Sequence, residues 1–258
     1  MIIRSGLCSV TFRALEPAHI AALAAESGLA AIEWAGDAHV PPGDLDHAAE
    51  VGRITADAGI AVASYGSYFR AGAGEEIAPW LDAAEALGAD RVRVWAGSVG
   101  SAEATPEERA QVASRVADAA LAAAERGLTL ALEYHGGTLA DTPQATLRLL
   151  AEVDHPALTS YWQPTVGAPD AVARDEFAAV AGQVSAIHAF SWWPDDERHP
   201  LQTRESLWTA VLAHAAALPA PPRDVLLEFI PDDDPALLPR EAAALRRMLA
   251  GAGAGQIV

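Results

Sequence analysis

Hydrophobic and polar positions follow two patterns that alternate along the chain. Short apolar runs rich in β-branched residues are each followed by an alanine-rich segment with helical periodicity. We expect strands at Ile3–Val10, Leu29–Trp34, Ile60–Tyr65, Arg91–Ala96, Leu128–Glu133, Leu158–Trp162, Val184–Phe190 and Val225–Phe229. We expect helices at Pro17–Glu26, Leu45–Ala58, Glu76–Leu87, Pro106–Arg126, Pro143–Glu152, Pro169–Ala181, Arg204–Ala217 and Pro235–Leu249. The pattern therefore predicts a repeated βα unit.

The number and size of these units favour a closed barrel. Eight strands with eight following helices in 258 residues are typical of a (β/α)₈ TIM barrel, which we expect to be a single domain over residues 1–258. An open, doubly wound sheet is the alternative. That fold normally carries a glycine-rich dinucleotide loop after its first strand, and residues 6–11 do not supply one. In a TIM barrel the active site lies at the C-terminal ends of the strands.

Composition and charge exclude several classes of function. The chain has 17 arginines, no lysine and 35 acidic residues, for a formal net charge of −18. Affinity for nucleic acid or for an anionic bilayer rests on clustered positive charge, so we expect neither partner. Without lysine, the chain cannot build a Schiff-base aldolase, a pyridoxal-phosphate site or a phosphate-binding loop of the Walker type.

Cysteine content and apolar runs bear on the cellular location. Cys8 is the single cysteine, so an intrachain disulfide framework and a cysteine zinc cluster are both excluded. Residues 1–6 lack the apolar core of a signal peptide, and no run of 18 apolar residues follows. We therefore expect a cytoplasmic protein.

Polar residues close four successive predicted strands, from the fifth to the eighth. They are Glu133, Gln163, His188 and Glu228. A carboxylate in an apolar strand costs several kcal/mol to bury unless a cation or hydrogen bonds compensate it. Two carboxylates, one amide oxygen and one imidazole would suit Mn²⁺ or Mg²⁺, and Co²⁺ or Zn²⁺ also accept imidazole. The alternative is an isolated salt bridge with an arginine, for which Arg93 is the best placed.

With these four residues, the chain resembles the xylose isomerase-like TIM barrels, in particular the sugar isomerases and epimerases related to tagatose epimerase and hydroxypyruvate isomerase. The resemblance covers essentially the whole chain. It implies a divalent metal held by Glu133, His188 and Glu228, which match the family in type, order and strand context. The family has aspartate at the position of Gln163, and often a histidine shortly afterwards. Here residues 164–167 read Pro-Thr-Val-Gly, so that substrate contact is lost or replaced.

The resemblance also implies a mechanism. Glu133 and Glu228 would exchange a substrate proton through a metal-bound enediolate, as in the epimerases. The hydride-shift relatives use an active-site lysine, which this chain lacks. We therefore expect a metal-dependent sugar or keto-acid isomerase or epimerase. The alternatives are a dehydratase of the keto-inositol or dehydroshikimate type and a catalytically weak carbohydrate-binding barrel. Many members of the family are dimers or tetramers, so a homo-oligomer is consistent with the resemblance.

A second set of residues at the strand ends could contact a small-molecule substrate. Aromatic rings stack on the C–H faces of sugars, and an imidazole beside Glu133 could contact substrate or orient that carboxylate. We include six residues as candidate substrate contacts: Glu33, Arg93, Trp95, His135, Trp162 and Trp192. For each aromatic residue, the alternative is that it fills space at the barrel mouth.

Overall fold

Eight parallel strands close into a barrel in the computed structural model, which describes residues 3–220 and 222–253. The strands pair in the order β1-β10-β7-β6-β5-β4-β3-β2, and β1 pairs with both β2 and β10. Their bounds are β1 (Arg4–Cys8), β2 (Ala31–Ala35), β3 (Ala61–Gly66), β4 (Arg91–Val94), β5 (Thr129–Leu132), β6 (Leu158–Trp162), β7 (Val184–Ala189) and β10 (Asp224–Leu227). The prediction of a single-domain (β/α)₈ TIM barrel is confirmed.

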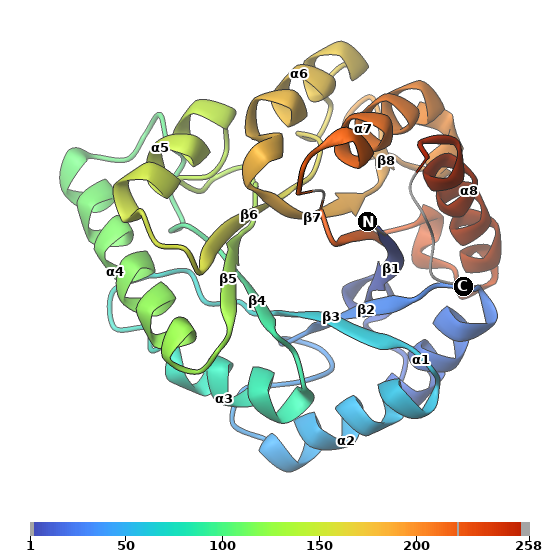
Figure 1. Cartoon of the computed structure of the whole chain (residues 1–258), viewed down its shortest axis with the longest axis horizontal. Coiled ribbons are helices and arrows are strands. Elements are labelled where there is room, and N and C mark those ends of the chain that lie inside the picture. Colours follow the sequence, from blue (N-terminus) through green and yellow to red (C-terminus); the bar gives the residue numbers. More distant parts are fainter. Residues whose placement is uncertain (1–2, 221, 254–258) are drawn as a thin grey trace.

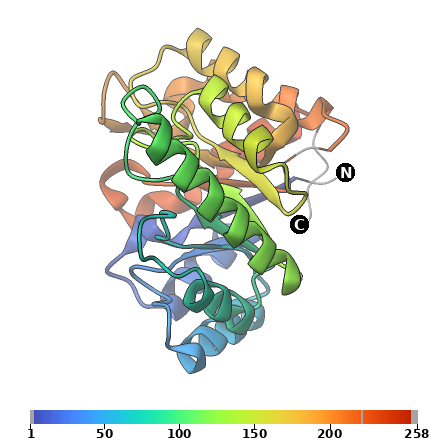
Figure 2. The same ribbon diagram turned by 90° about the vertical axis from the view of Figure 1, so that its left-hand side faces the viewer.

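Helices form a ring outside the strands (Figure 1). They are α1 (Pro17–Glu26), α2 (Leu45–Asp57), α3 (Ala78–Leu87), α4 (Pro106–Glu125), α5 (Pro143–Val153), α6 (Asp170–Val180), α7 (Glu205–Ala217) and α8 (Leu238–Gly251). Figure 2 shows α4 running along the near side of the barrel. Thr105 caps α4 by accepting a hydrogen bond from the backbone N–H of Glu108, whose side chain bonds back to the backbone N–H of Thr105. No helix in the described part of the chain is long and apolar enough to cross a membrane.

Five of the observed strands end earlier than predicted, whereas β2 and β3 end one residue later and β6 ends as predicted. The β4 strand ends at Val94 instead of Ala96, and β5 ends at Leu132, one residue before Glu133. The loop after β7 also holds a two-stranded antiparallel ribbon that we did not predict, formed by β8 (Ser191–Trp192) and β9 (Arg198–His199). Two residues per strand are too few to show a periodic hydrophobic pattern.

Strand β4 shows how side chains divide between the barrel interior and the helices. Its sequence is Arg-Val-Arg-Val, and all four residues are buried. Because successive side chains point to opposite faces of a strand, the valines and the arginines face different environments. Val92 and Val94 belong to the main hydrophobic cluster, whereas Arg91 and Arg93 make ion pairs across the barrel. The barrel interior is therefore partly ionic.

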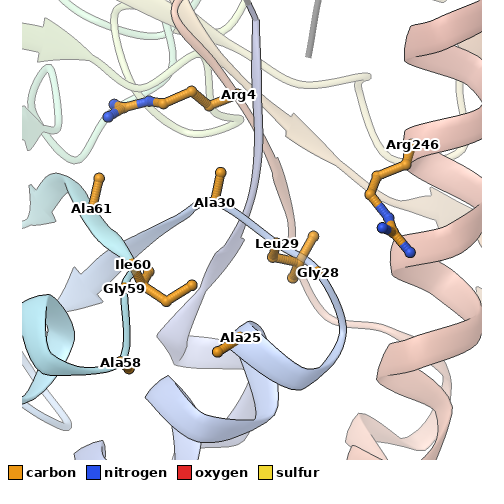
Figure 3. Close-up of a pocket in the computed structure, with 10 residues that line it drawn as sticks. All are labelled: Arg4, Ala25, Gly28, Leu29, Ala30, Ala58, Gly59, Ile60, Ala61 and Arg246. Carbon is orange, nitrogen blue, oxygen red and sulfur yellow. The ribbon is translucent and has the colours of Figure 1, made fainter. Parts of the chain in front are cut away.

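Arg91 belongs to a buried ionic cluster at the amino ends of the strands. Asp224, which is fully buried, accepts hydrogen bonds from Arg91 Nη2 and Arg4 Nε, each at 2.6 Å. The guanidinium of Arg91 also lies 4.9 Å from the centre of the Tyr161 ring. Arg4 borders a cavity of about 480 Å³ that opens at this end of the barrel, and Arg246 lies on its opposite side (Figure 3). Among the described residues, none of those that line this cavity carries a carboxylate or an imidazole.

Candidate functional site

The four residues that close the later strands come together at the carboxyl end of the barrel. Glu133, His188 and Glu228 each place a side-chain donor atom within 4.8 Å of the other two. Gln163 Oε1 lies 3.2 Å from His188 Nδ1, and Glu228 Oε2 lies 3.4 Å from the same nitrogen. All four side chains are buried, with His188 completely so. His188 Nδ1 therefore faces oxygens of Gln163 and Glu228, and a carboxylate oxygen of Glu133 lies within 4.8 Å of a His188 ring nitrogen.

Strand geometry explains this convergence. Glu133, Gln163 and Glu228 each follow directly after the last residue of β5, β6 and β10, and His188 lies in β7. These four strands are neighbours in the barrel, in the order β10-β7-β6-β5. The register pairs Trp162 with Ile187 and Leu226 with His188, so Gln163 lies level with His188 and Glu228 lies two residues beyond it. All four side chains reach the carboxyl end of the barrel interior.

Arg93 adds a cation to this group. Its Nε donates to Glu33 Oε1 at 2.9 Å, and its Nη1 donates to Glu133 Oε2. Burial disfavours the charged guanidinium, but the carboxylates of Glu133, Glu33 and Glu228 outweigh it and raise the pKa of Arg93 well above its usual range. The salt bridge that we weighed against a metal site does form. The Arg93–Glu133 salt bridge uses Oε2 of Glu133 and does not involve the His188–Glu228 pair.

Burial and charge act in opposite directions on His188. Burial favours the neutral imidazole, but the carboxylates of Glu228 and Glu33 outweigh it and raise the pKa of His188 well above its usual range. Burial also raises the pKa of the Cys8 thiol to about 12, so that side chain is neutral. Sequence analysis used Cys8 only to exclude disulfides and zinc clusters. The predicted first strand ran on to Val10, and only the structure shows that β1 ends at Cys8.

A cavity of about 250 Å³ opens beside the four residues. Seven of the predicted site residues line this cavity: Arg93, Trp95, Glu133, His135, Gln163, Trp192 and Glu228. The stack of Trp95 on His135, with ring centres 4.2 Å apart, forms one side. Trp192 and Phe229 lie on another side, with ring centres 5.6 Å apart. The cavity therefore combines titratable groups with aromatic surfaces.

Sequence analysis did not identify the other residues that line this cavity. They are Val10, Tyr68, Val166, Phe190 and Phe229. Tyr68 and Val166 lie in loops, where no periodic pattern shows which way a side chain points. Phe229 directly follows Glu228, so its position at the end of the predicted strand could have identified it as a lining residue.

The structure places Trp162 away from the cavity. Its side chain is fully buried and packs edge-on against Phe177 of α6 and Trp208 of α7, with ring centres 5.0 and 6.2 Å apart. The reason is strand alternation, because Tyr161 and Gln163 take the interior side and Trp162 must face the helices. Glu33 also does not line the cavity. It lies among Arg93, His188 and Ser64 and is almost completely buried.

Comparisons with known proteins agree with this architecture. A segment of 69 residues is 39% identical to a 3-dehydroshikimate dehydratase of Bacillus anthracis, a match that covers 27% of this chain and 25% of that protein. The crystal structure of the probable 3-DHS dehydratase from Bacillus anthracis superposes with a TM-score of 0.70 at 20% identity, covering 95% of this chain and 99% of that one.

Two further solved structures share the fold. An L-ribulose 3-epimerase superposes with a TM-score of 0.74 at 16% identity, covering 98% of this chain and 96% of that one. A barrel from Mycobacterium smegmatis, solved in complex with magnesium, superposes with a TM-score of 0.67 at 17% identity over 97% of both chains. The model of one family, the xylose isomerase-like TIM barrels, matches residues 21–201. The chain therefore belongs to the xylose isomerase-like TIM barrel family.

Proposed function

We propose that this protein is a divalent-metal-dependent isomerase or epimerase that acts on a small sugar or keto acid by proton transfer. The observation that carries the proposal is the convergence of Glu133, His188 and Glu228 within 4.8 Å, with Gln163 beside them and a cavity adjoining. Family relatives include epimerases and a dehydratase, which supports an enzymatic role.

The residues present fit a divalent cation. The carboxylates of Glu33, Glu133 and Glu228 are buried together, and Arg93 is the arginine that contacts this group. An excess of buried negative charge is costly, and a divalent cation offsets it. Two carboxylates, an amide oxygen and an imidazole suit Mn²⁺ or Mg²⁺ and also accept Co²⁺ or Zn²⁺. A magnesium complex of a protein with the same fold supports this assignment.

In the proposed mechanism, Glu133 and Glu228 transfer the substrate proton. A bound cation would polarise a substrate carbonyl and make the adjacent C–H more acidic. One glutamate takes that proton, and the other returns one to the same carbon or its neighbour. Arg93 donates to Oε2 of Glu133, which helps to fix the direction of that carboxylate. Trp95 and Trp192 offer aromatic surfaces for the C–H faces of the substrate, and the cavity of about 250 Å³ limits its size.

Gln163 provides a prediction about the metal. Gln163→Asp should tighten Mn²⁺ binding, because it replaces a neutral oxygen donor with a charged one 3.2 Å from His188 Nδ1. Calorimetry with Mn²⁺ alone measures the change. Gln111→Glu, which adds the same charge at an exposed position on α4, serves as the control and should leave the affinity unaltered. Equal affinities for Gln163→Asp and the unmodified protein would exclude Gln163 from the ligand set.

A dehydratase is the second candidate function, favoured by the segment that is 39% identical to a 3-dehydroshikimate dehydratase. The two reactions differ in their products. A dehydratase eliminates water and forms a new carbon–carbon double bond, whereas an isomerase or epimerase conserves the molecular formula of its substrate. Mass spectrometry after incubation with dehydroshikimate and with a panel of ketoses separates the two. Failure to bind Mn²⁺ would favour the carbohydrate-binding barrel instead.

A further inference from the structure

The two nitrogens of His188 face different groups. Nδ1 lies on the side of Gln163 and Glu228, at 3.2 and 3.4 Å from their side-chain oxygens. Nε2 lies 3.4 Å from Glu33 Oε1 and makes no hydrogen bond to any described residue. A nitrogen that binds a metal must present its lone pair. A metal bound at Nδ1 therefore requires the ring proton to be on Nε2.

Glu33 is suited to accept a hydrogen bond from an Nε2–H group. A carboxylate accepts hydrogen bonds only, so it favours an N–H group facing it. Ser64 and Arg93 both donate hydrogen bonds to Glu33, an arrangement that suits an acceptor-only carboxylate. Cys8 also lies beside His188, but its neutral thiol is a much weaker acceptor.

The surroundings hold Glu33 in one position. Ser64 Oγ donates to its Oε2 at 2.7 Å, and Arg93 Nε donates to its Oε1 at 2.9 Å. Gly66 leaves room for this pair: a Cβ at that residue would lie 2.7 Å from Arg93 Nη2 and 3.0 Å from Glu33 Oε1. Glu33 is 2% exposed and does not line the cavity.

We propose that Glu33 is a positioning residue that holds His188 with its proton on Nε2 and its Nδ1 lone pair directed to the side of Gln163 and Glu228. Through Arg93, the same carboxylate is linked to Glu133, so it aligns two of the four proposed ligands. This inference rests on the proposed metal-dependent function, and it gives Glu33 a role different from the substrate contact expected from the sequence.

The first test measures metal affinity rather than activity. Calorimetry with Mn²⁺ alone compares the unmodified protein with Glu33→Ala and Glu33→Gln. Loss of a carboxylate that orients a ligating histidine weakens metal binding by about 10–100-fold, which is the effect expected for Glu33→Ala. Glu33→Gln should weaken binding less, since its amide oxygen still accepts the Nε2 proton. Asp90→Asn, which removes a carboxylate paired with Arg223 away from this site, is the control and should bind like the unmodified protein.

The second test observes the ring directly. In ¹⁵N-labelled protein loaded with Zn²⁺, long-range ¹H–¹⁵N spectra should show the His188 proton on Nε2. A proton on Nδ1 would overturn the proposal, even if Glu33→Ala failed to fold. Unchanged Mn²⁺ affinity in Glu33→Ala would overturn it as well, while leaving the proposed function intact. No Mn²⁺ binding by the unmodified protein would instead remove the proposed function and this inference together.

Discussion

Replacing Glu228 by glutamine is expected to lower turnover of a true substrate by about 10²–10⁴-fold, the usual contribution of a positioned acid or base. Glu133→Gln should do the same, because the two carboxylates are proposed to divide one proton transfer between them. Glutamine keeps the shape of the side chain but cannot take a proton. Both variants must be compared at saturating Mn²⁺, since each glutamate is also a proposed ligand.

Deuterated water identifies the chemistry behind that loss. With the unmodified protein, solvent deuterium should appear on the reacting carbon of the product, detected by mass spectrometry or NMR. Glu152→Gln, which alters a surface carboxylate paired with Arg148 and Arg109, should retain full turnover. Complete retention of substrate hydrogen would point to a hydride shift. Full activity in both Glu133→Gln and Glu228→Gln would remove the two glutamates from the mechanism.

The largest effect on stability is expected when the carboxylate of Asp224 is removed. Asp224→Ala leaves Arg91 and Arg4 without their shared carboxylate at a site where Asp224 itself is 0% exposed. Breaking a buried ion pair from one side costs about 3–5 kcal/mol, because the remaining charge stays buried without a partner. The free energy of unfolding, from urea titration followed by circular dichroism, measures this loss.

A surface ion pair provides the matched control. Asp82→Ala removes a carboxylate that pairs with Arg126 on the outer helices, where both side chains are partly exposed. Solvent screens such pairs, so the expected loss is at most about 1 kcal/mol. If Asp224→Ala cost no more than Asp82→Ala, the buried cluster would contribute little to the stability of the barrel.

The sequence was sufficient for the fold because two periodicities alternate without interruption. Each predicted strand overlaps an observed one, and the four polar residues at the later strand ends do converge. This success follows from geometry, since neighbouring parallel strands bring equivalent positions to the same end of the barrel.

Other features were not accessible from local patterns. Whether Arg93 pairs with Glu133, Glu33 or both depends on distances across the barrel, and no one-dimensional spacing encodes them. Asp224 lies at the start of a strand that we expected to begin at Val225, so its burial was not anticipated. The error at Trp162 was avoidable. With Gln163 assigned to the interior, alternation along the strand already places its neighbour on the helix side.

The cavity draws its reactive and its shape-determining residues from different parts of the barrel. Glu133, Gln163 and Glu228 follow directly after barrel strands, whereas Tyr68 and Val166 come from the connecting loops. Loops tolerate substitution better than the elements they connect. Directed evolution of substrate range can therefore begin at Tyr68 and Val166, where new side chains reshape the cavity and leave the ionic framework beneath it in place.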